Sequence, residues 1–250
     1  MLFGTGMVLQ IGVGAIIPCL PAYTQSIGLP ESSIGLLVAV PSFARVLLNL
    51  PAGCLADLVG RKRPMVVGTL MDGAGCIGTA LAGTLPGIAA SRLLMGSGAA
   101  IAGNAASAYT MDVVNKFPLH RGRIMGGMQS AGALAFVLGP VLGGFLAERG
   151  GIALPFVLVG ATCFATVPLI QLLLPETRPP PPGSSLSSLE LRPVIDEALR
   201  SFAELLRDRN QRALLCAQCG LFTGWSVRGS VPPDPRPRAP SPRPESKPSP

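Results

Sequence analysis

Six long apolar segments follow one another before residue 176, and each of them is long enough to cross a lipid bilayer. A membrane-spanning helix needs about 20 consecutive, mostly apolar residues. A bilayer core offers no water to backbone polar groups, so such a segment satisfies its own hydrogen bonds by forming a helix. The sequence therefore predicts an all-α membrane protein, a six-helix transmembrane bundle. The helices are expected at about residues 2–20, 34–56, 64–82, 88–111, 124–147 and 150–175.

The composition supports a membrane protein independently of the segment lengths. Hydrophobic residues make up 48% of the chain and charged residues 13%, whereas an ordinary soluble domain carries about 25% charged residues. The first apolar segment is not interpreted as a signal peptide, because no basic residues precede it and five similar segments follow. The net charge of +7 is divided between short loops and the C-terminal tail. Since no basic stripe is interleaved with aromatic residues, nucleic acid is not an expected partner.

Few residues are suited to metal, cofactor or catalytic chemistry. His120 is the only histidine, and most of the six cysteines lie within apolar segments, where a cysteine acts as a small hydrophobe. Cys216 and Cys219 form a lone C-x-x-C pair in an apolar segment, so no metal or redox site is predicted there. The phosphate-binding sequence G-x-x-x-x-G-K-[ST] is not present in the chain, and direct use of ATP is therefore not expected. We expect no metal, no cofactor and no enzymatic activity.

Loop charges predict how the helices are oriented. Basic residues gather in the loops after the second, fourth and sixth predicted helices, whereas the alternate loops carry only Glu31, Glu148 and Arg149. Basic loops stay on the cytoplasmic side of a membrane. We therefore expect a multi-pass integral membrane protein with a cytoplasmic N-terminus. The basic residues concerned are Arg61, Lys62, Arg63, Lys116, Arg121, Arg123 and Arg178.

The loop between the second and third helices narrows the class of protein. Residues 53–64 read Gly-Cys-Leu-Ala-Asp-Leu-Val-Gly-Arg-Lys-Arg-Pro. This resembles the G-x-L-a-D-r-x-G-r-k-x loop between spans two and three of major facilitator superfamily transporters. Ser91–Ala100 is similar to the fourth-helix motif of that family, with Met95 in place of its glutamine. The resemblance covers residues 1–178 well and residues 204–225 loosely.

Three further segments resemble the drug:proton antiporter branch of the same family. Gly132, followed by Gly139-Pro140-Val141-Leu142-Gly143-Gly144, is similar to its fifth-helix motif G-(x)6-G-P-x-x-G-G. Ile17–Pro21 resembles the end of its helix one, and Pro175–Arg178 resembles the segment after its helix six. The chain departs from the family at His120, which stands where a glutamate usually precedes the R-G-R sequence of the fourth loop.

The resemblance implies the N-terminal six-helix half of a facilitator-type transporter, built from two inverted three-helix repeats. It implies a secondary active transporter that moves a small organic solute by alternating access, with proton antiport as the favoured coupling. The implied partners are the lipid bilayer, the solute, protons, and either a second transporter half or a second copy of the chain. The alternative is a non-transporting fragment or a membrane-embedded interaction or regulatory subunit, because a facilitator would continue with a second half. A truncation, a splice form and a wrong reading frame would each explain the C-terminal sequence.

The chain changes character after the sixth predicted helix. We predict a six-span domain at residues 1–178 and a Pro/Ser-rich linker at residues 179–193. Apolar residues at helical spacing predict an amphipathic helix on the cytoplasmic surface at residues 194–210. Residues 211–227 are too short an apolar segment to span comfortably, so they predict an incomplete seventh span. The Pro-rich residues 228–250 predict a disordered tail.

Three charged residues lie inside predicted spans. A charge at the centre of a membrane helix costs at least about 2.5–3.5 kcal/mol, so it usually faces a water-filled path or a partner. Arg92 is assigned to a substrate or proton pathway, with snorkelling to the interface as the alternative. Arg45 and Asp72 lie about 16 Å and 12 Å from the cytoplasmic ends of helices two and three. If those helices are packed neighbours, the two charges meet, and both an ion pair and a substrate or proton role stay open. Asp72 is the candidate proton carrier.

Uncharged polar residues inside the spans are weaker candidates for the same pathway. These are Gln10, Asn104 and Gln129. Each is equally suited to an interhelical hydrogen bond.

Two further roles follow from the resemblance. The first is a conformational latch, implied at Gly53, Asp57, Gly60, Arg61, Lys62 and Arg63. Asp112, Arg121, Arg123, Glu176 and Arg178 would extend it. The alternative is a basic loop that only fixes the orientation of the helices in the membrane.

The second is a helix-packing role, implied at Gly132, Gly139, Pro140, Gly143 and Gly144. Glycines four residues apart let helices approach closely, and Pro140 permits a bend. In the family this face contacts the other half, so we expect it to be an unpartnered surface here.

Overall fold

The computed structural model describes residues 2–30 and 32–177, together with the isolated positions 196, 200, 207 and 213. Apart from those four positions, the predictions for the C-terminal part of the chain lie outside the described residues. They comprise the linker at 179–193, the amphipathic helix at 194–210, the seventh span at 211–227 and the tail at 228–250.

Six α-helices and one turn of 3-10 helix make up the described part of the chain. They are α1 (Leu2–Ser26), α2 (Ser32–Val59), α3 (Lys62–Leu81), α4 (Leu85–Lys116), η1 (Pro118–His120), α5 (Arg121–Gly150) and α6 (Leu154–Leu173). Within these ranges, α2 to α6 are long and apolar enough to cross a membrane, and α1 has 25 residues, none of which is charged. The predicted all-α six-helix bundle is therefore confirmed.

Most helices extend a few residues beyond their predicted ends, and in α1 and α4 a proline lies within the added residues. α6 is instead shorter than the predicted 150–175, since it runs from Leu154 to Leu173. α1 continues past Pro21 to Ser26 instead of ending near residue 20. The turn predicted at residues 83–87 is shorter, because α4 begins at Leu85 with Pro86 in its first turn. Proline is favoured at that position, since its missing N–H would be unpaired there in any case. Prolines are also tolerated inside membrane helices, where neighbouring groups satisfy the freed carbonyls.

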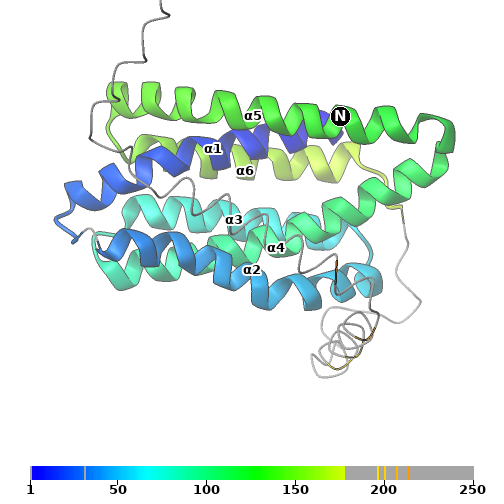
Figure 1. Cartoon of the computed structure of the whole chain (residues 1–250), viewed down its shortest axis with the longest axis horizontal. Coiled ribbons are helices and arrows are strands. Elements are labelled where there is room, and N and C mark those ends of the chain that lie inside the picture. The colour runs from blue at the N-terminus through cyan, green and yellow to red at the C-terminus, as the bar shows by residue number, and fades with distance from the viewer. Residues whose placement is uncertain are drawn as a thin grey trace, which may run out of the picture. The chain divides into compact units, whose positions relative to one another are not determined.

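The helices pack in a pattern that relates the first three to the last three. α1 packs against α5 as α4 packs against α2, and α3 and α6 pack against each other. Figure 1 shows α5 and α2 on opposite sides of the bundle, with α3 and α4 beside each other near its middle. Exchanging α1 with α4, α2 with α5 and α3 with α6 leaves these pairings unchanged. This is the arrangement expected of two three-helix repeats.

The expectation that helices two and three are packed neighbours is wrong. α2 and α3 make few contacts, because each of them packs mainly against α4. Glycines on α4 let it approach both helices closely. A methyl group placed on Gly96 would lie 2.6 Å from Cα of Pro41 on α2, and one placed on Gly98 would lie 2.5 Å from the carbonyl oxygen of Gly68 on α3.

The glycines of α5 face α1, so the expectation of an unpartnered glycine surface is also wrong. A methyl group on Gly139 would lie 2.7 Å from Cα of Gly14, and one on Gly143 would lie 2.4 Å from the carbonyl oxygen of Ala15. Both glycines are buried. Close helix packing inside this bundle therefore accounts for them. The other members of the set differ, since Gly132 is half-buried, Pro140 is exposed, and Gly144 has open space around it.

The α1–α5 contact gives a matched pair of substitutions one residue apart. Gly143→Ala should destabilise the bundle by about 1–3 kcal/mol, the usual cost of forcing extra atoms into a packed site. Gly144→Ala should be neutral or slightly stabilising, because alanine is about 1 kcal/mol better than glycine inside a helix. Thermal unfolding of the detergent-solubilised chain measures both. Equal melting temperatures for the two variants would mean that α1 does not approach α5 at Gly143.

Two apolar clusters fill the bundle at different levels. The first contains Ile16, Cys19, Leu20, Tyr23, Leu37, Cys76, Ile88, Met95 and Phe156, and the second contains Ala56, Met65, Ala105, Tyr109, Ile170 and Leu174. The first cluster includes the last turns of α1 and the first turns of α4, whereas the second includes the end of α2 and the start of α3.

Candidate functional site

The turn between α2 and α3 brings the predicted latch residues together. α2 ends at Val59 and α3 begins at Lys62. Gly60 between them has a φ of +93°, a backbone conformation that residues with a side chain adopt only with strain. The glycine reverses the chain within two residues, which places Arg61 at the end of the bundle between α2 and α4.

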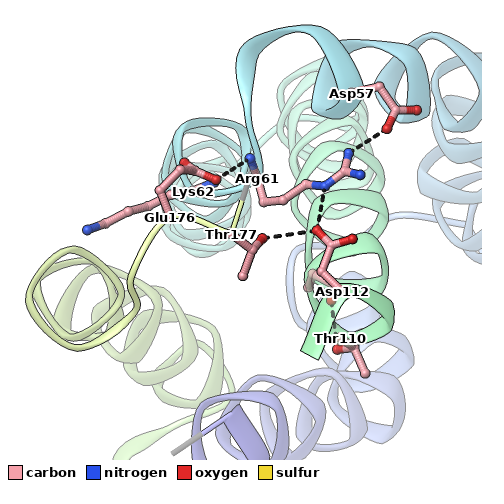
Figure 2. A network of polar contacts seen from close by, with 8 residues as sticks. Asp57, Arg61, Lys62, Thr110, Asp112, Glu176 and Thr177 are labelled. Atoms are coloured by element: carbon pink, nitrogen blue, oxygen red, sulfur yellow. Dashed lines mark hydrogen bonds and ion pairs between the residues drawn. The ribbon is translucent and has the colours of Figure 1, made fainter. Parts of the chain in front are cut away.

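Arg61 is the centre of a polar network that links three parts of the chain (Figure 2). Its side chain is buried, and its Nη1 lies 2.7 Å from Oδ1 of Asp57 at the end of α2. Its Nε lies 3.2 Å from Oδ2 of Asp112 near the end of α4. Burial by itself lowers the pKa of Arg61, but hydrogen bonds and charge attraction from the two aspartates outweigh burial and raise the pKa above its ordinary value. The guanidinium therefore stays charged and bridges α2 and α4.

Glu176 accepts hydrogen bonds at the start of α3. Its Oε1 accepts from the backbone N–H of Arg61 at 2.9 Å, and its Oε2 accepts from the backbone N–H of Lys62 at 3.2 Å (Figure 2). The first backbone N–H groups of a helix have no partner within the helix, and the helix dipole favours a negative charge beside them. The sequence predicted Glu176 as a member of the charge cluster, and the structure shows both of its carboxylate oxygens accepting from the backbone of the α2–α3 turn.

The last turn of α6 and the segment that follows it are attached to this network by one contact each. Thr177 donates from Oγ1 to Oδ2 of Asp112 at 3.0 Å, and Lys62 donates from Nζ to the carbonyl oxygen of Gln171 at 2.5 Å. Sequence analysis missed Thr177 and Gln171. Both contacts join positions far apart in the chain, so no local sequence pattern predicts them. Thr177 nevertheless follows Glu176 directly, within the segment that the sequence had already identified.

The remaining latch candidates lie outside this network. Gly53 is half-buried in α2, whereas Arg63, Arg121 and Arg123 are exposed. Within residues 32–177 the two salt bridges present are those of Arg61, so these three arginines form none there. Arg178 lies outside the described residues.

A cavity of about 180 Å³ lies between α1, α2 and α4. Arg45 and Arg92 both line it, together with Ser42. The rest of its described wall is apolar, from Ile16, Leu20, Val38, Pro41 and Met95. Sequence analysis selected the two arginines separately and did not predict that they share one cavity.

The side chain of Arg92 is buried beside a thioether sulfur and an aromatic ring. Arg92 is 4% exposed, its Nη1 lies 3.9 Å from Sδ of Met95, and its Cζ lies 5.5 Å from the centroid of the Phe156 ring. Neither Nε nor Nη2 has a hydrogen-bond partner among the described residues. A snorkelling arginine keeps its charged end in water, so this burial does not fit the snorkelling alternative.

The other pathway candidates do not form one hydrogen-bonded site. Arg45 is exposed and Asp72 is half-buried, and no salt bridge joins them among the described residues, although the charge of Arg45 acts on Asp72. Asn104 donates to Oδ1 of Asn49 at 3.1 Å, which links α4 to α2. Gln129 is exposed, and the side chain of Gln10 lies outside the described residues.

Comparisons with known proteins agree with this architecture. An uncharacterised MFS-type transporter of Methanocaldococcus jannaschii is 33% identical over 151 residues, covering 60% of this chain and 39% of the relative. The quinolone resistance protein NorA of Staphylococcus aureus is 30% identical over 152 residues, covering 60% of this chain and 38% of the relative. The chain thus spans about two fifths of the length of these curated relatives.

A solved structure shows the same fold at lower sequence identity. The human organic anion transporter MFSD10 superposes with a TM-score of 0.60 at 21% identity, covering 82% of this chain and 55% of that one. The sequence profile of the Major Facilitator Superfamily matches residues 2–232. With six apolar helices packed in this way and a profile match over most of its length, the chain is a multi-pass integral membrane protein that belongs to the Major Facilitator Superfamily.

Proposed function

We propose that the chain is one half of a secondary active transporter that moves a small organic solute by alternating access. The observation that carries this proposal is the cavity between α1, α2 and α4, which holds the buried Arg92. An ionisable group inside a membrane bundle usually marks a substrate or ion pathway. Membership of a transporter family supports the same conclusion.

As a transport unit, the bundle would pack against a second transporter half or a second copy of this chain. The described helices form a single six-helix bundle, and the chain spans about two fifths of the length of the curated relatives that it matches. α2 and α5 carry large exposed apolar side chains that suit contact with a second half as well as with lipid. They include Phe43, Val46 and Leu47 on α2, and Phe136, Val137 and Val141 on α5.

The Arg61 network would act as the cytoplasmic latch of this transporter. Positively charged loops favour the cytoplasmic side, and the network lies at the end of the bundle that carries Arg61, Lys62 and Arg63. It ties α2 to α4 and to the segment after α6. Such a network would hold this end rigid while the two halves rock against each other.

Proton antiport is the proposed coupling, with Asp72 as the proton carrier. Asp72 lies in the middle of α3, and the other acids of the described helices lie near helix ends. A proton carrier has to change its exposure during the cycle, and the half-buried position of Asp72 beside α4 suits such a change.

Transport is tested with the purified chain reconstituted into liposomes under a pH gradient. The assay measures proton flux after a solute is added. The three solutes are aromatic compounds of different charge: benzenesulfonate, benzenesulfonamide and benzamidinium. We expect at least one of them to be exchanged for protons and so to cause a measurable proton flux. Arg92→Ala should reduce this flux by about tenfold or more, since a hydrogen bond to a charged group is worth about 1.5–3 kcal/mol. Arg149→Ala, at the end of α5, is the matched control and should retain the flux. A folded chain that moves none of the three would instead be a fragment or an interaction subunit.

A further inference from the structure

We propose that the cavity between α1, α2 and α4 binds the head group of an organic anion, a carboxylate or sulfonate with a small apolar body, through Arg92 and Arg45. This names the solute class for the function proposed above and rests on it. It extends that function because neither the fold nor the alternating-access cycle specifies the charge of the solute.

The charge of the cavity wall is the first argument. Two arginines line it, and none of the described lining residues is acidic. Charges act more strongly on one another in the low dielectric of a membrane bundle than in water. A cleft lined by charges of one sign attracts ions of the opposite sign, and it repels cationic solutes for the same reason.

The unpartnered edge of Arg92 is the second argument. The guanidinium has five donors and no acceptor. The two nitrogens without a partner, Nε and Nη2, stand side by side on one edge of that group. This edge fits the two oxygens of a carboxylate or sulfonate in a bidentate pair. Nη1 has only the weak acceptor Sδ of Met95, so an oxyanion would supply acceptors that the described residues do not.

The apolar wall and the depth of the cavity indicate the rest of the ligand. The wall includes Ile16, Leu20 and Met95, which suit a compact hydrocarbon or aromatic body. Arg45 lies 13 residues after Ser32 and 14 before Val59 in the 28-residue helix α2, or about 20 Å from either end at 1.5 Å per residue. The hydrocarbon core of a bilayer is about 30 Å thick. Arg45 therefore lies near its middle, out of reach of a lipid phosphate, and the occupant is a solute.

The test measures equilibrium binding of three similarly sized aromatic compounds to the full chain in nanodiscs of neutral lipid. Benzenesulfonate should bind at least about tenfold more tightly than the uncharged benzenesulfonamide, and benzamidinium should bind more weakly than both. Arg92→Gln should remove the preference for the anion. Arg45→Gln should reduce it less, because Arg45 is exposed, and Arg149→Gln, outside the cavity, should leave it unchanged.

Several results would overturn the proposal. Equal binding of the three compounds, a preference for benzamidinium, or an anion preference that survives Arg92→Gln would each do so. Competition by phosphatidylglycerol added to the nanodiscs would assign the cavity to a lipid head group instead. The comparison of the three compounds on the unaltered chain tests the preference for an anion even if a variant fails to fold. Flux without anion preference would reject this inference alone, whereas anion binding without flux would reject the transport function and leave the anion cavity standing.

Discussion

Replacing Gly98 by leucine should lower the free energy of unfolding by about 3 kcal/mol, because α3 and α4 touch there backbone to backbone. A methyl group on Gly98 would lie 2.4 Å from the backbone nitrogen of Asp72 and 2.5 Å from the carbonyl oxygen of Gly68. The reciprocal contact is as close, since a methyl group on Gly68 would lie 2.4 Å from the backbone nitrogen of Ala102. Backbone atoms cannot move aside as the end of a flexible side chain can, so the helices would have to separate.

The matched control for this substitution is Gly103→Leu on the same helix. Gly103 has nothing within 4 Å of an added methyl group, and leucine is a better helix former than glycine. Gly103→Leu should therefore leave the melting temperature unchanged or raise it, whereas Gly98→Leu should lower it by several degrees. Unfolding in SDS or by heat, in the same detergent, measures both. If Gly98→Leu were tolerated as well as Gly103→Leu, α3 and α4 would not be in direct contact and the packing order of the helices would be wrong.

The spans were predictable from the sequence, but the packing order of the helices was not. The length of each apolar segment predicts one spanning helix, since the thickness of the bilayer sets the number of residues that a span needs. Which helices touch depends on small residues that allow close approach. Gly96 and Gly98 do this on α4, and Gly139 and Gly143 on α5. Sequence analysis interpreted the α5 glycines as a surface for another half because it had no means of seeing α1 opposite them.

The candidate site was predictable to a similar extent. The sequence of the α2–α3 loop identified Asp57, Gly60 and Arg61, because an acid, a glycine and a basic cluster between two apolar helices form a local pattern. The contacts of Glu176 with backbone N–H groups have no local signature, since they join residues 114 and 115 positions apart. The cavity was missed for the same reason, because it exists only once α1, α2 and α4 are in place.

Removing the Arg61 side chain should cost about 3 kcal/mol of stability, the second large effect that we expect. The pair with Asp112 contributes most of it, because the Arg61 side chain is 6% exposed and that of Asp112 is 29% exposed. A hydrogen bond to a charged group in such a setting is worth about 1.5–3 kcal/mol. The pair with Asp57 adds less than about 1 kcal/mol, since the Asp57 side chain is 55% exposed and solvent weakens such pairs.

Arg61→Ala isolates the side chain from the backbone contact at the same residue. The hydrogen bond from the Arg61 backbone N–H to Glu176 needs no side chain, so the start of α3 should remain intact in the variant. Arg63→Ala, two residues away and exposed, carries the same change of charge and should shift stability by no more than about 0.5 kcal/mol.

A double-mutant cycle then separates the interaction energy between Arg61 and Asp112 from any general loss of stability. If Arg61 acts through Asp112, Arg61→Ala and Asp112→Ala together should cost less than the sum of the two single substitutions by about 1 kcal/mol or more. Additive effects would mean that the two side chains do not interact. In that case α2 and α4 would be held together by their apolar contacts and the Asn104–Asn49 hydrogen bond, and the latch proposed at this end of the bundle would lose its central member.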